Sequence, residues 1–394
     1  LVYHGISTES SISGDNLKVV IGRLEGFEAP LGAWEHDLLP ARVNYDPDEL
    51  ERLITGGDVV WGRLNPPEMT EESRGKILTR ATPIALIQRE DLNWLLPLER
   101  KISIGVARWD AQAAYDALKH NGALFFSDLL AVTKLLPSQL DSALRELAAL
   151  GAVTSDGFAA IRAVSTKSKH GLGRSRRKSR SRANDISSRG GRWSLFPPFH
   201  SKVETDGRTE KWAWQLLKRY GVVFRDLLVR ESLSPRWSEL SRIYRRLEMR
   251  GEIRGGRFVH GVCGEQFALP EVVEQVRSLR ADPAKDCWAV ISAVDPLNLV
   301  GVLTKDMRVS AQRGNRLVLL NGRAIAARES CQTRWLTDVN DELRNRAEQL
   351  LLQPGQLGHG AAINRRQIRD PEFMDASVIA KRIVRRSGIG PAAV

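Results

Sequence analysis

Five of the six arginines between residues 242 and 257 have the residue type and the spacing needed to bind phosphate groups. Arg242 and Arg246 are four positions apart, so they share one face of a helix, and Arg245 lies beside them. Arg254 and Arg257 flank two adjacent glycines, a pair typical of the tip of a two-residue hairpin turn. A basic helix followed by a basic hairpin indicates contact with DNA or RNA through the phosphate backbone.

Ion pairing within the protein is the alternative role for these arginines. Carboxylates lie close to them in the sequence, at Glu239, Glu248 and Glu252. The tryptophans of the same region are expected to be buried in the core rather than to stack on bases. They are Trp212, Trp214 and Trp237.

The helix and hairpin that carry these arginines belong to an internal repeat, formed by residues 122–158 and 221–258. Each copy has a D-L-L step and then a helix with apolar residues at intervals of three or four. A glycine, Gly151 or Gly251, is expected to end that helix in a left-handed conformation. With the amphipathic helix before each copy and a hairpin after it, the order predicts a winged helix-turn-helix. A fainter copy begins at Asp37.

The three copies differ in the charge of the helix that would face a nucleic acid. In the first copy this helix is acidic, with Asp46, Asp48, Glu49 and Glu51. In the second copy its single cation is Arg145. We therefore expect strong nucleic-acid binding from the third copy alone, and packing roles for the first two.

Most of the net charge of +12 comes from one segment. Between Thr166 and Arg192, ten Lys and Arg residues and one acid give a net charge of +9, which leaves +3 for the rest of the chain. The segment is rich in Ser and Gly and lacks a hydrophobic period, so it predicts a flexible linker or a long loop. Arg176, Arg177 and Lys178 are its candidate contacts to a polyanion. A solvated loop without a binding role is the alternative.

Short β-rich runs after Pro283 predict a different fold for the C-terminal part. The runs are Ala289–Ala293, Leu299–Leu303 and Leu317–Ala327. The last contains Asn321-Gly322, a strong hairpin signal. We expect a small antiparallel β-barrel here, then a helix over Asp338–Leu352 and an amphipathic stretch over Ala376–Arg386.

The predicted fold class is α+β, with tandem winged-helix domains followed by a small antiparallel β-barrel and a C-terminal helical segment. A chain of 394 residues is too long for a single core, so several domains are expected. The predicted boundaries are 1–105 (winged-helix-like module with β-hairpins), 106–165 (winged helix), 166–192 (basic linker), 193–282 (winged helix with basic recognition helix and wing), 283–335 (β-barrel) and 336–394 (C-terminal helices and tail).

Composition and missing motifs exclude several function classes. No apolar run approaches the ~18–20 residues that span a bilayer, so no membrane partner is expected. No G-x-x-x-x-G-K-[ST] loop is present, so we expect no ATP hydrolysis. Three separated cysteines and seven histidines without metal spacing predict no disulfide framework, no metal and no cofactor, in a reducing cytoplasm. No signal-peptide pattern follows Leu1, and the chain is interpreted as a fragment of a longer protein.

Three sequence stretches together resemble one family, the bacterial large helicase-related proteins (Lhr). They are EGFEAPLGAWEHDLLPARV from residue 25, GRTEKWAWQLLKRYGVVFRDLL from residue 207, and AVDPLNLVG from residue 293. The resemblance covers about three quarters of the chain and is most specific in the third copy. It implies the C-terminal region of a superfamily 2 helicase, with tandem winged helices, a β-barrel and an overall plan similar to AlkZ-type DNA glycosylases.

This resemblance implies three alternative functions. The first is a DNA-binding module, for single-stranded or duplex DNA, of an Lhr-type repair helicase whose ATPase core belongs to the same polypeptide. The second is a monofunctional DNA glycosylase of the uracil type. The third is a mainly structural oligomerisation scaffold that assembles the subunits of the helicase.

A catalytic candidate for the glycosylase comes from the same resemblance. AlkZ-type enzymes carry a short Gln-apolar-Gln/Asp motif, and residues 292–298 resemble its Asp-containing form, with Ala293 where the first Gln stands. Asp295 is the implied catalytic carboxylate and Asn298 the implied water or base contact. Since Asp-Pro is also a turn signal, a turn is the alternative for Asp295. Asp375 is a weaker catalytic candidate, with a helix N-cap as its alternative.

Overall fold

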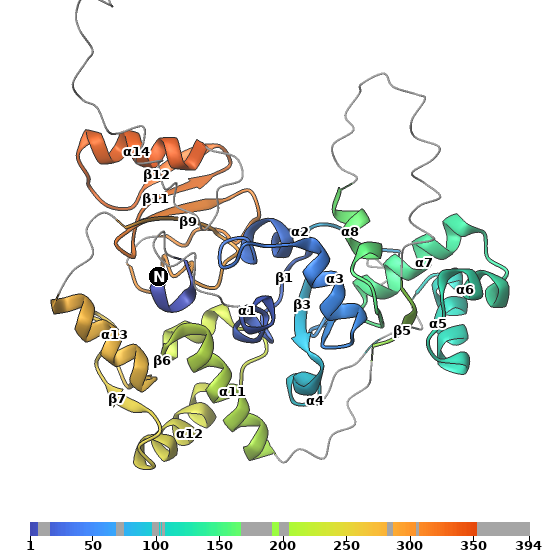
Figure 1. The fold of residues 1–394 in the computed structure, drawn as a ribbon, viewed down its shortest axis with the longest axis horizontal. Helices are drawn as coiled ribbons and strands as arrows, with labels where there is room; N and C mark the ends of the chain where they lie inside the picture. Colours follow the sequence, from blue (N-terminus) through green and yellow to red (C-terminus); the bar gives the residue numbers. More distant parts are fainter. Residues whose placement is uncertain are drawn as a thin grey trace, which may run out of the picture.

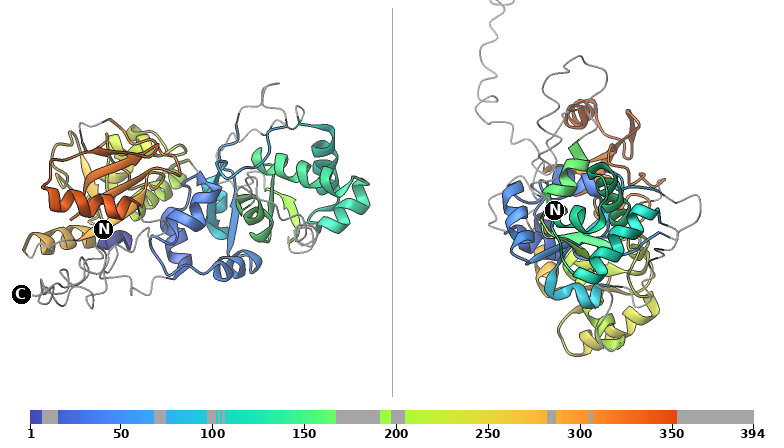
Figure 2. Two further views of the ribbon diagram at one scale, coloured as in Figure 1. Left: turned by 90° about the horizontal axis from the view of Figure 1, so that it is seen from above. Right: turned by 90° about the vertical axis from the view of Figure 1, so that its right-hand side faces the viewer.

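The computed structural model describes most of the chain. The described residues are 1–6, 16–67, 75–96, 102, 104, 107–166, 191–196, 205–281, 287–304 and 307–352. They form three helical modules with small sheets, and a separate C-terminal sheet (Figures 1 and 2). The first module (residues 1–96) lies in the middle, with the second module (107–196) on one side and the third module (205–281) and the C-terminal sheet (287–352) on the other.

The first module is built around three antiparallel strands in the order β1-β3-β2. Its elements are η1 (Val2–His4), α1 (Leu17–Leu24), β1 (Ala29–Pro30), α2 (Leu31–Ala33), the π-helical turn η2 (Trp34–Leu38), α3 (Pro47–Thr55), β2 (Val59–Gly62), β3 (Pro83–Gln88), η4 (Arg89–Asp91) and α4 (Leu92–Leu95). Both faces of the sheet are buried, which explains the continuous apolar run of β3.

The two faces of this sheet pack into different cores because successive side chains of a strand point to opposite faces. Trp61 and Leu86 belong to a core that continues into the second module. Val60 and Ile87 belong to a core that continues into the third module. The first module is therefore the structural link between the other two.

The second module follows the helix–helix–helix order that the repeat predicts. Its elements are α5 (Trp109–Asn121), α6 (Phe126–Thr133), α7 (Pro137–Ala149), β4 (Val153–Ser155), α8 (Ala159–Thr166) and β5 (Trp193–Leu195). β5 pairs antiparallel with β4, with Ser155 opposite Trp193. The segment 166–192, for which the sequence predicts a flexible linker or a long loop, thus lies between α8 and β5 of a single module. The module ends after β5 because that strand completes its sheet.

The third module has the complete winged-helix order. Its elements are α11 (Thr205–Tyr220), β6 (Val222–Phe224), the 3-10 helix η7 (Arg225–Arg230), α12 (Trp237–Met249), β7 (Arg254–Gly256), β8 (Gln266–Ala268) and α13 (Pro270–Ala281). Its sheet has the order β6-β8-β7. Gly151 and Gly251, the glycines expected to end the repeated helices, have φ of 72° and 76° as predicted.

The C-terminal sheet is open, so the predicted β-barrel is wrong. Its strands β9 (Trp288–Ser292), β10 (Arg316–Leu320), β11 (Arg323–Glu329) and β12 (Gln332–Trp335) have the order β12-β11-β10-β9. In the described part of the chain, β9 and β12 each pair with one strand and not with each other. Closure is unnecessary because α14 (Asp341–Leu352) covers one face, while Ile6, Val300 and Val309 pack on the other.

Two sequence expectations for this region have opposite outcomes. Asn321 and Gly322 form the tight β10–β11 turn, with φ of 50° and 80°, as predicted. The apolar run Leu299–Leu303 was expected to be β-structure, but it forms turns that cover the sheet. The stretch Ala376–Arg386 lies outside the described residues.

Buried polar groups join the first and third modules. The Arg219 guanidinium donates hydrogen bonds to the backbone carbonyl of Glu25 and to the Glu231 carboxylate. The amide of Gln215 also donates to the Glu25 carbonyl, at 3.3 Å. The side chain of Glu25 accepts a 2.5 Å hydrogen bond from the Gln88 N–H. Burial is the main cause that raises the pKa of Glu25, to about 8.

This pKa predicts that stability depends on pH through Glu25. The folded-state pKa of Glu25, about 8, exceeds the usual value of 4.5. The contribution of the protonated carboxyl to the free energy of unfolding is therefore complete below pH 4.5 and is lost as the pH rises through 8. Glu25→Gln does not titrate. One pKa unit corresponds to about 1.4 kcal/mol, and relaxation of the buried site around the ionised carboxyl lowers the effect. We therefore expect the variant to be more stable by roughly 2 kcal/mol near pH 8.5.

Thermal unfolding of wild type and Glu25→Gln at pH 5 and pH 8.5 measures this effect. The two curves should differ little at pH 5, where the wild-type carboxyl is protonated. Glu342→Gln on the exposed side of α14 is the control. Equal pH dependence of wild type and Glu25→Gln would show that the carboxyl is ionised in the folded protein.

Candidate nucleic-acid interface

Helix α12 is held in place by its apolar face. Leu240, Ile243 and Leu247 are buried at spacings of three and four residues. Tyr244 is fully buried, and its hydroxyl donates a 3.0 Å hydrogen bond to the Ala213 carbonyl of α11. The opposite face of α12 is therefore left toward solvent, and it carries Arg242 and Arg245, whereas Arg246 is half-buried.

Ion pairs engage part of the arginine cluster. The Arg245 guanidinium donates two 2.8 Å hydrogen bonds to the carboxylate of Glu265 on the wing. This contact lowers the pKa of Glu265. Arg246 pairs with Glu210 of α11 at 2.8 Å. The partners are thus carboxylates from neighbouring elements rather than from α12 itself.

Three of the five predicted contacts keep an unpaired guanidinium. Arg242, Arg254 and Arg257 are exposed, and within the described part of the chain none of them forms an ion pair or hydrogen bond through its side chain. Arg242 lies on α12, Arg254 on β7, and Arg257 follows β7 directly. A cation that has no carboxylate partner binds a phosphate without the free-energy cost of breaking an ion pair. These three arginines are therefore the strongest candidates for phosphate contact.

The wing has a different tip from the one predicted. Gly255 and Gly256 lie within β7 and pair with β8, so the tip is formed by residues 257–265. The physical reason is strand pairing: Gly255 lies opposite Phe267 in the antiparallel β7–β8 pair, and neither glycine has a positive φ. The turn-forming glycines are Gly261 and Gly264, with φ of 79° and 89°.

The corresponding helices of the other modules offer no comparable basic surface. On α7, Arg145 pairs with Asp141 at 3.0 Å, and Glu146 is buried. On α3, Asp46 is the N-cap and accepts a hydrogen bond from the Asp48 N–H, which leaves an acidic exposed end. Trp212, which the sequence assigns to the core, is fully buried.

Asp295, the carboxylate implied to be catalytic, lies in a buried ion pair between the first module and the C-terminal sheet. Its two oxygens accept hydrogen bonds of 2.7 and 2.9 Å from Arg42, and both side chains are almost completely buried. One oxygen also accepts from the Leu297 N–H at 2.9 Å, which is the turn geometry expected of Asp-Pro. Arg230 of the third module donates to the Asp295 carbonyl at 3.0 Å.

Asn298 is buried beside this ion pair. Its amide nitrogen donates to the carbonyls of Ala293 and Val309, at 2.8 and 3.0 Å. The structure thus brings Asp295 and Asn298 together in one loop, where both side chains are buried. The unpaired arginines of α12 and the wing, in contrast, are exposed. Arg42 was missed by the sequence reasoning, because no spacing rule connects residues 253 positions apart.

The remaining candidates fall outside the described residues. They are Arg176, Arg177, Lys178 and Asp375. Among the described residues, no group of three His, Cys, Asp or Glu side chains could hold a metal ion. Within the same residues, no helix combines the length and apolar character needed to cross a membrane.

Comparison with known proteins assigns two parts of the chain. Residues 1–88 and 202–288 match the models of the third and fourth winged-helix domains of the large helicase-related protein. The chain is 27% identical over 354 residues to the Lhr helicase/uracil glycosylase of Escherichia coli K12, covering 82% of this chain and 21% of that protein. It is also 27% identical over 337 residues to the Lhr helicase/probable uracil glycosylase of Mycolicibacterium smegmatis, covering 79% and 21%.

The chain therefore spans about a fifth of the length of these curated relatives. Among solved structures, the DNA glycosylase AlkZ of Streptomyces sahachiroi is similar with a TM-score of 0.45 and 14% identity, over 89% of this chain and 94% of that one. The resemblance that residues 25–43 and 207–228 indicate is confirmed. Two winged-helix domains of the large helicase-related protein type thus make up residues 1–88 and 202–288 of this chain.

Proposed function

We propose that this chain binds DNA through α12 and the wing of its third module, with Arg242, Arg254 and Arg257 on the phosphates. The observation that carries the proposal is the exposure of three unpaired arginines on the helix and wing of a winged-helix domain. Arg245 and Arg246 contribute by exchanging their carboxylate partners for phosphates. Arg176, Arg177 and Lys178 add contacts that do not depend on sequence.

Substitution of Arg242 tests this assignment. We expect Arg242→Ala to bind a labelled single strand or duplex about three- to tenfold more weakly at low salt, because one phosphate contact is lost. The measurement is fluorescence anisotropy. Arg323→Ala removes the same charge from an exposed position on the β10–β11 hairpin and is the matched control. Equal weakening by both variants would mean that net charge, not α12, governs binding.

The names of the relatives support a helicase context for the proposed DNA-binding role. Both carry the word helicase in their names, and this chain corresponds to about a fifth of their length. We propose that the chain acts as an accessory DNA-binding region of an Lhr-type DNA repair helicase, whose ATPase core lies elsewhere in the polypeptide. The same anisotropy measurement with an RNA strand in place of the DNA strand compares the affinities for RNA and DNA.

A DNA glycosylase is the second candidate function, and the relatives' names favour it. Asp295 and Asn298 are its proposed residues, although their burial requires the joint with Arg42 to open before a base could reach them. Incubation with a single strand carrying one uracil, followed by alkali, is expected to cleave at that position. Cleavage by Asp295→Asn at the wild-type rate would remove Asp295 from the chemistry.

A further inference from the structure

The loop at the end of the wing is held by one buried side chain. This wing loop (residues 257–265) joins β7 to β8, and Gln266 follows it as the first residue of β8. Gln266 is buried, and its amide oxygen accepts hydrogen bonds from the Phe258 and Val259 N–H groups at 2.8 and 2.7 Å. Its amide nitrogen donates to the Val259 and Val262 carbonyls at 3.0 and 3.3 Å. An amide has two donor hydrogens and two acceptor positions, so the wing loop uses all four.

Gln266 is itself fixed by its place in the sheet. β8 is the central strand, and Gln266 lies opposite Phe224 of β6 and Gly256 of β7. Strand pairing on both sides holds its backbone, so the amide extends from a rigid strand into the wing loop. Movement of the loop away from Gln266 would leave a buried amide without partners, which is unfavourable. The four hydrogen bonds therefore restrain the loop to one conformation.

Other contacts leave the amide as the main polar restraint on the wing loop. Val262 adds an apolar anchor, because it belongs to the core of the third module. Glu265 pairs with Arg245 of α12, but their side chains are 44% and 57% exposed, and such ion pairs contribute little to stability. Gly261 and Gly264 give the loop a large conformational freedom to lose. The buried amide is therefore the polar contact that the loop most needs.

The restraint acts on Arg257, one of the three unpaired arginines. Arg257 directly precedes Phe258, whose N–H is bonded to the amide oxygen of Gln266. Arg254, in contrast, lies within β7 and is fixed by pairing with Ala268 of β8. The backbone position of Arg257 thus depends on the Gln266 amide, whereas that of Arg254 does not.

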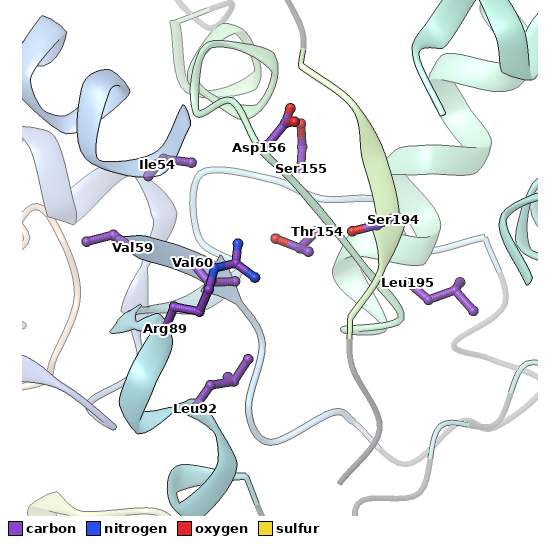
Figure 3. A pocket seen from close by; sticks show the side chains of 10 residues that line it. All are labelled: Ile54, Val59, Val60, Arg89, Leu92, Thr154, Ser155, Asp156, Ser194 and Leu195. Atoms are coloured by element: carbon purple, nitrogen blue, oxygen red, sulfur yellow. The ribbon is translucent and has the colours of Figure 1, made fainter. Parts of the chain in front are cut away.

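The cavity of about 240 Å³ beside β2, between the first and second modules, is a weaker candidate for DNA recognition (Figure 3). Its apolar walls include Val59 and Leu92, which are buried. Asp156 also lines it, and this carboxylate already pairs with Arg192 at 2.9 Å. The cavity therefore offers little accessible surface to a DNA strand, and we expect recognition from the third module.

We propose that Gln266 is a positioning residue that fixes the wing loop before DNA binds and thereby favours duplex over single-stranded DNA. The inference rests on the proposed DNA binding through α12 and the wing. The phosphates of a stiff duplex have fixed positions, so a cation that is already in place binds them without an ordering cost. A single strand is flexible, so it can bring a phosphate to a displaced Arg257.

The test removes the amide and keeps the length of the side chain. Gln266→Met is compared with Gln275→Met, the matched control at an exposed position on α13. In anisotropy titrations we expect Gln266→Met to bind a duplex about threefold more weakly than wild type and a single strand equally well. For the duplex, the dependence of log affinity on log salt should become shallower by about 0.9, because one phosphate contact is lost. Arg257→Ala, which removes the contact itself, should weaken the binding of both forms of DNA.

Combined variants separate a positioning role from a general loss of stability. Gln266→Met/Arg257→Ala should bind the duplex no more weakly than Arg257→Ala, because no guanidinium remains at residue 257 to be positioned. Gln266→Met/Arg254→Ala should bind about tenfold more weakly than wild type, because the two losses are independent. Additive losses in both combinations would overturn the proposal.

Amide hydrogen exchange in the wild type tests the proposal even if Gln266→Met is poorly folded. The Phe258 and Val259 N–H groups should exchange slowly in the free chain, and addition of the duplex should change their rates little. Protection that develops only on addition of the duplex would show that DNA orders the wing loop, and it would overturn the proposal.

The failures of the two proposals are distinguishable. Absence of DNA binding by the wild type would overturn the proposed function and this inference with it. Wild-type affinity of folded Gln266→Met for the duplex, or equal weakening by Gln275→Met, would overturn the role of Gln266 and leave DNA binding intact.

Discussion

Asp295→Asn should lower the stability of the protein by about 3–5 kcal/mol, because it leaves the Arg42 guanidinium buried without a counter-charge. The side chains of the pair are 3% and 1% exposed, so water cannot replace the lost carboxylate. Arg42→Met should cost a similar amount for the same reason. Thermal or urea unfolding at pH 7 measures both.

Two controls define this expectation. Asp338→Asn removes a carboxylate whose side chain is 98% exposed, and should change stability by less than about 0.5 kcal/mol. The double variant Arg42→Met/Asp295→Leu should recover much of the loss, because it removes both charges together. If Asp295→Asn were as stable as Asp338→Asn yet failed to release uracil, the carboxylate would be catalytic rather than structural.

Replacing Arg242, Arg254 and Arg257 together by alanine should weaken DNA binding about 30-fold at low salt. Exposed charge contacts contribute roughly 0.7 kcal/mol each, and three of them give that factor. The dependence of log affinity on log salt should also become shallower by about 2 for a single strand, since each lost phosphate contact releases fewer counterions. Anisotropy titrations over a series of salt concentrations give both numbers.

A matched triple variant separates position from charge. Arg52→Ala, Arg277→Ala and Arg323→Ala remove the same net charge from α3, α13 and the β10–β11 hairpin. This variant should keep an affinity within a few-fold of wild type. An equal loss in both triple variants would assign DNA binding to the overall field of the protein rather than to α12 and the wing.

Local sequence patterns predict the parts of this structure that local physics determines. The repeated helices, the left-handed Gly151 and Gly251 and the turn at Asn321-Gly322 follow from apolar spacing and from φ preferences. The resemblance of AVDPLNLVG and its neighbours to one family is also readable from the residues alone. At these positions the conformational preference of the local sequence agrees with the conformation in the fold.

The sequence predicts poorly what depends on neighbours distant in the chain. Gly255-Gly256 reads as a turn, but both glycines pair with β8, ten or more residues further along the chain, and so belong to a strand. β9 and β12 do not close into a barrel because α14 already buries one face of the sheet, and Ile6, Val300 and Val309 bury the other. Arg42 and Val59 carry no motif, so the joint with Asp295 and the cavity beside β2 emerge only when the modules are assembled.

The sheet shared between cores has a thermodynamic consequence. Since Val60 and Ile87 face the third module while Trp61 and Leu86 face the second, melting of β2 and β3 would expose apolar surface in three modules at once. The repeats are therefore not independent folding units, and heating should produce one shared transition for residues 16–281 rather than three. A fragment cut at the start of α11 would expose Trp212, which Trp94 covers in the intact chain, and would tend to aggregate.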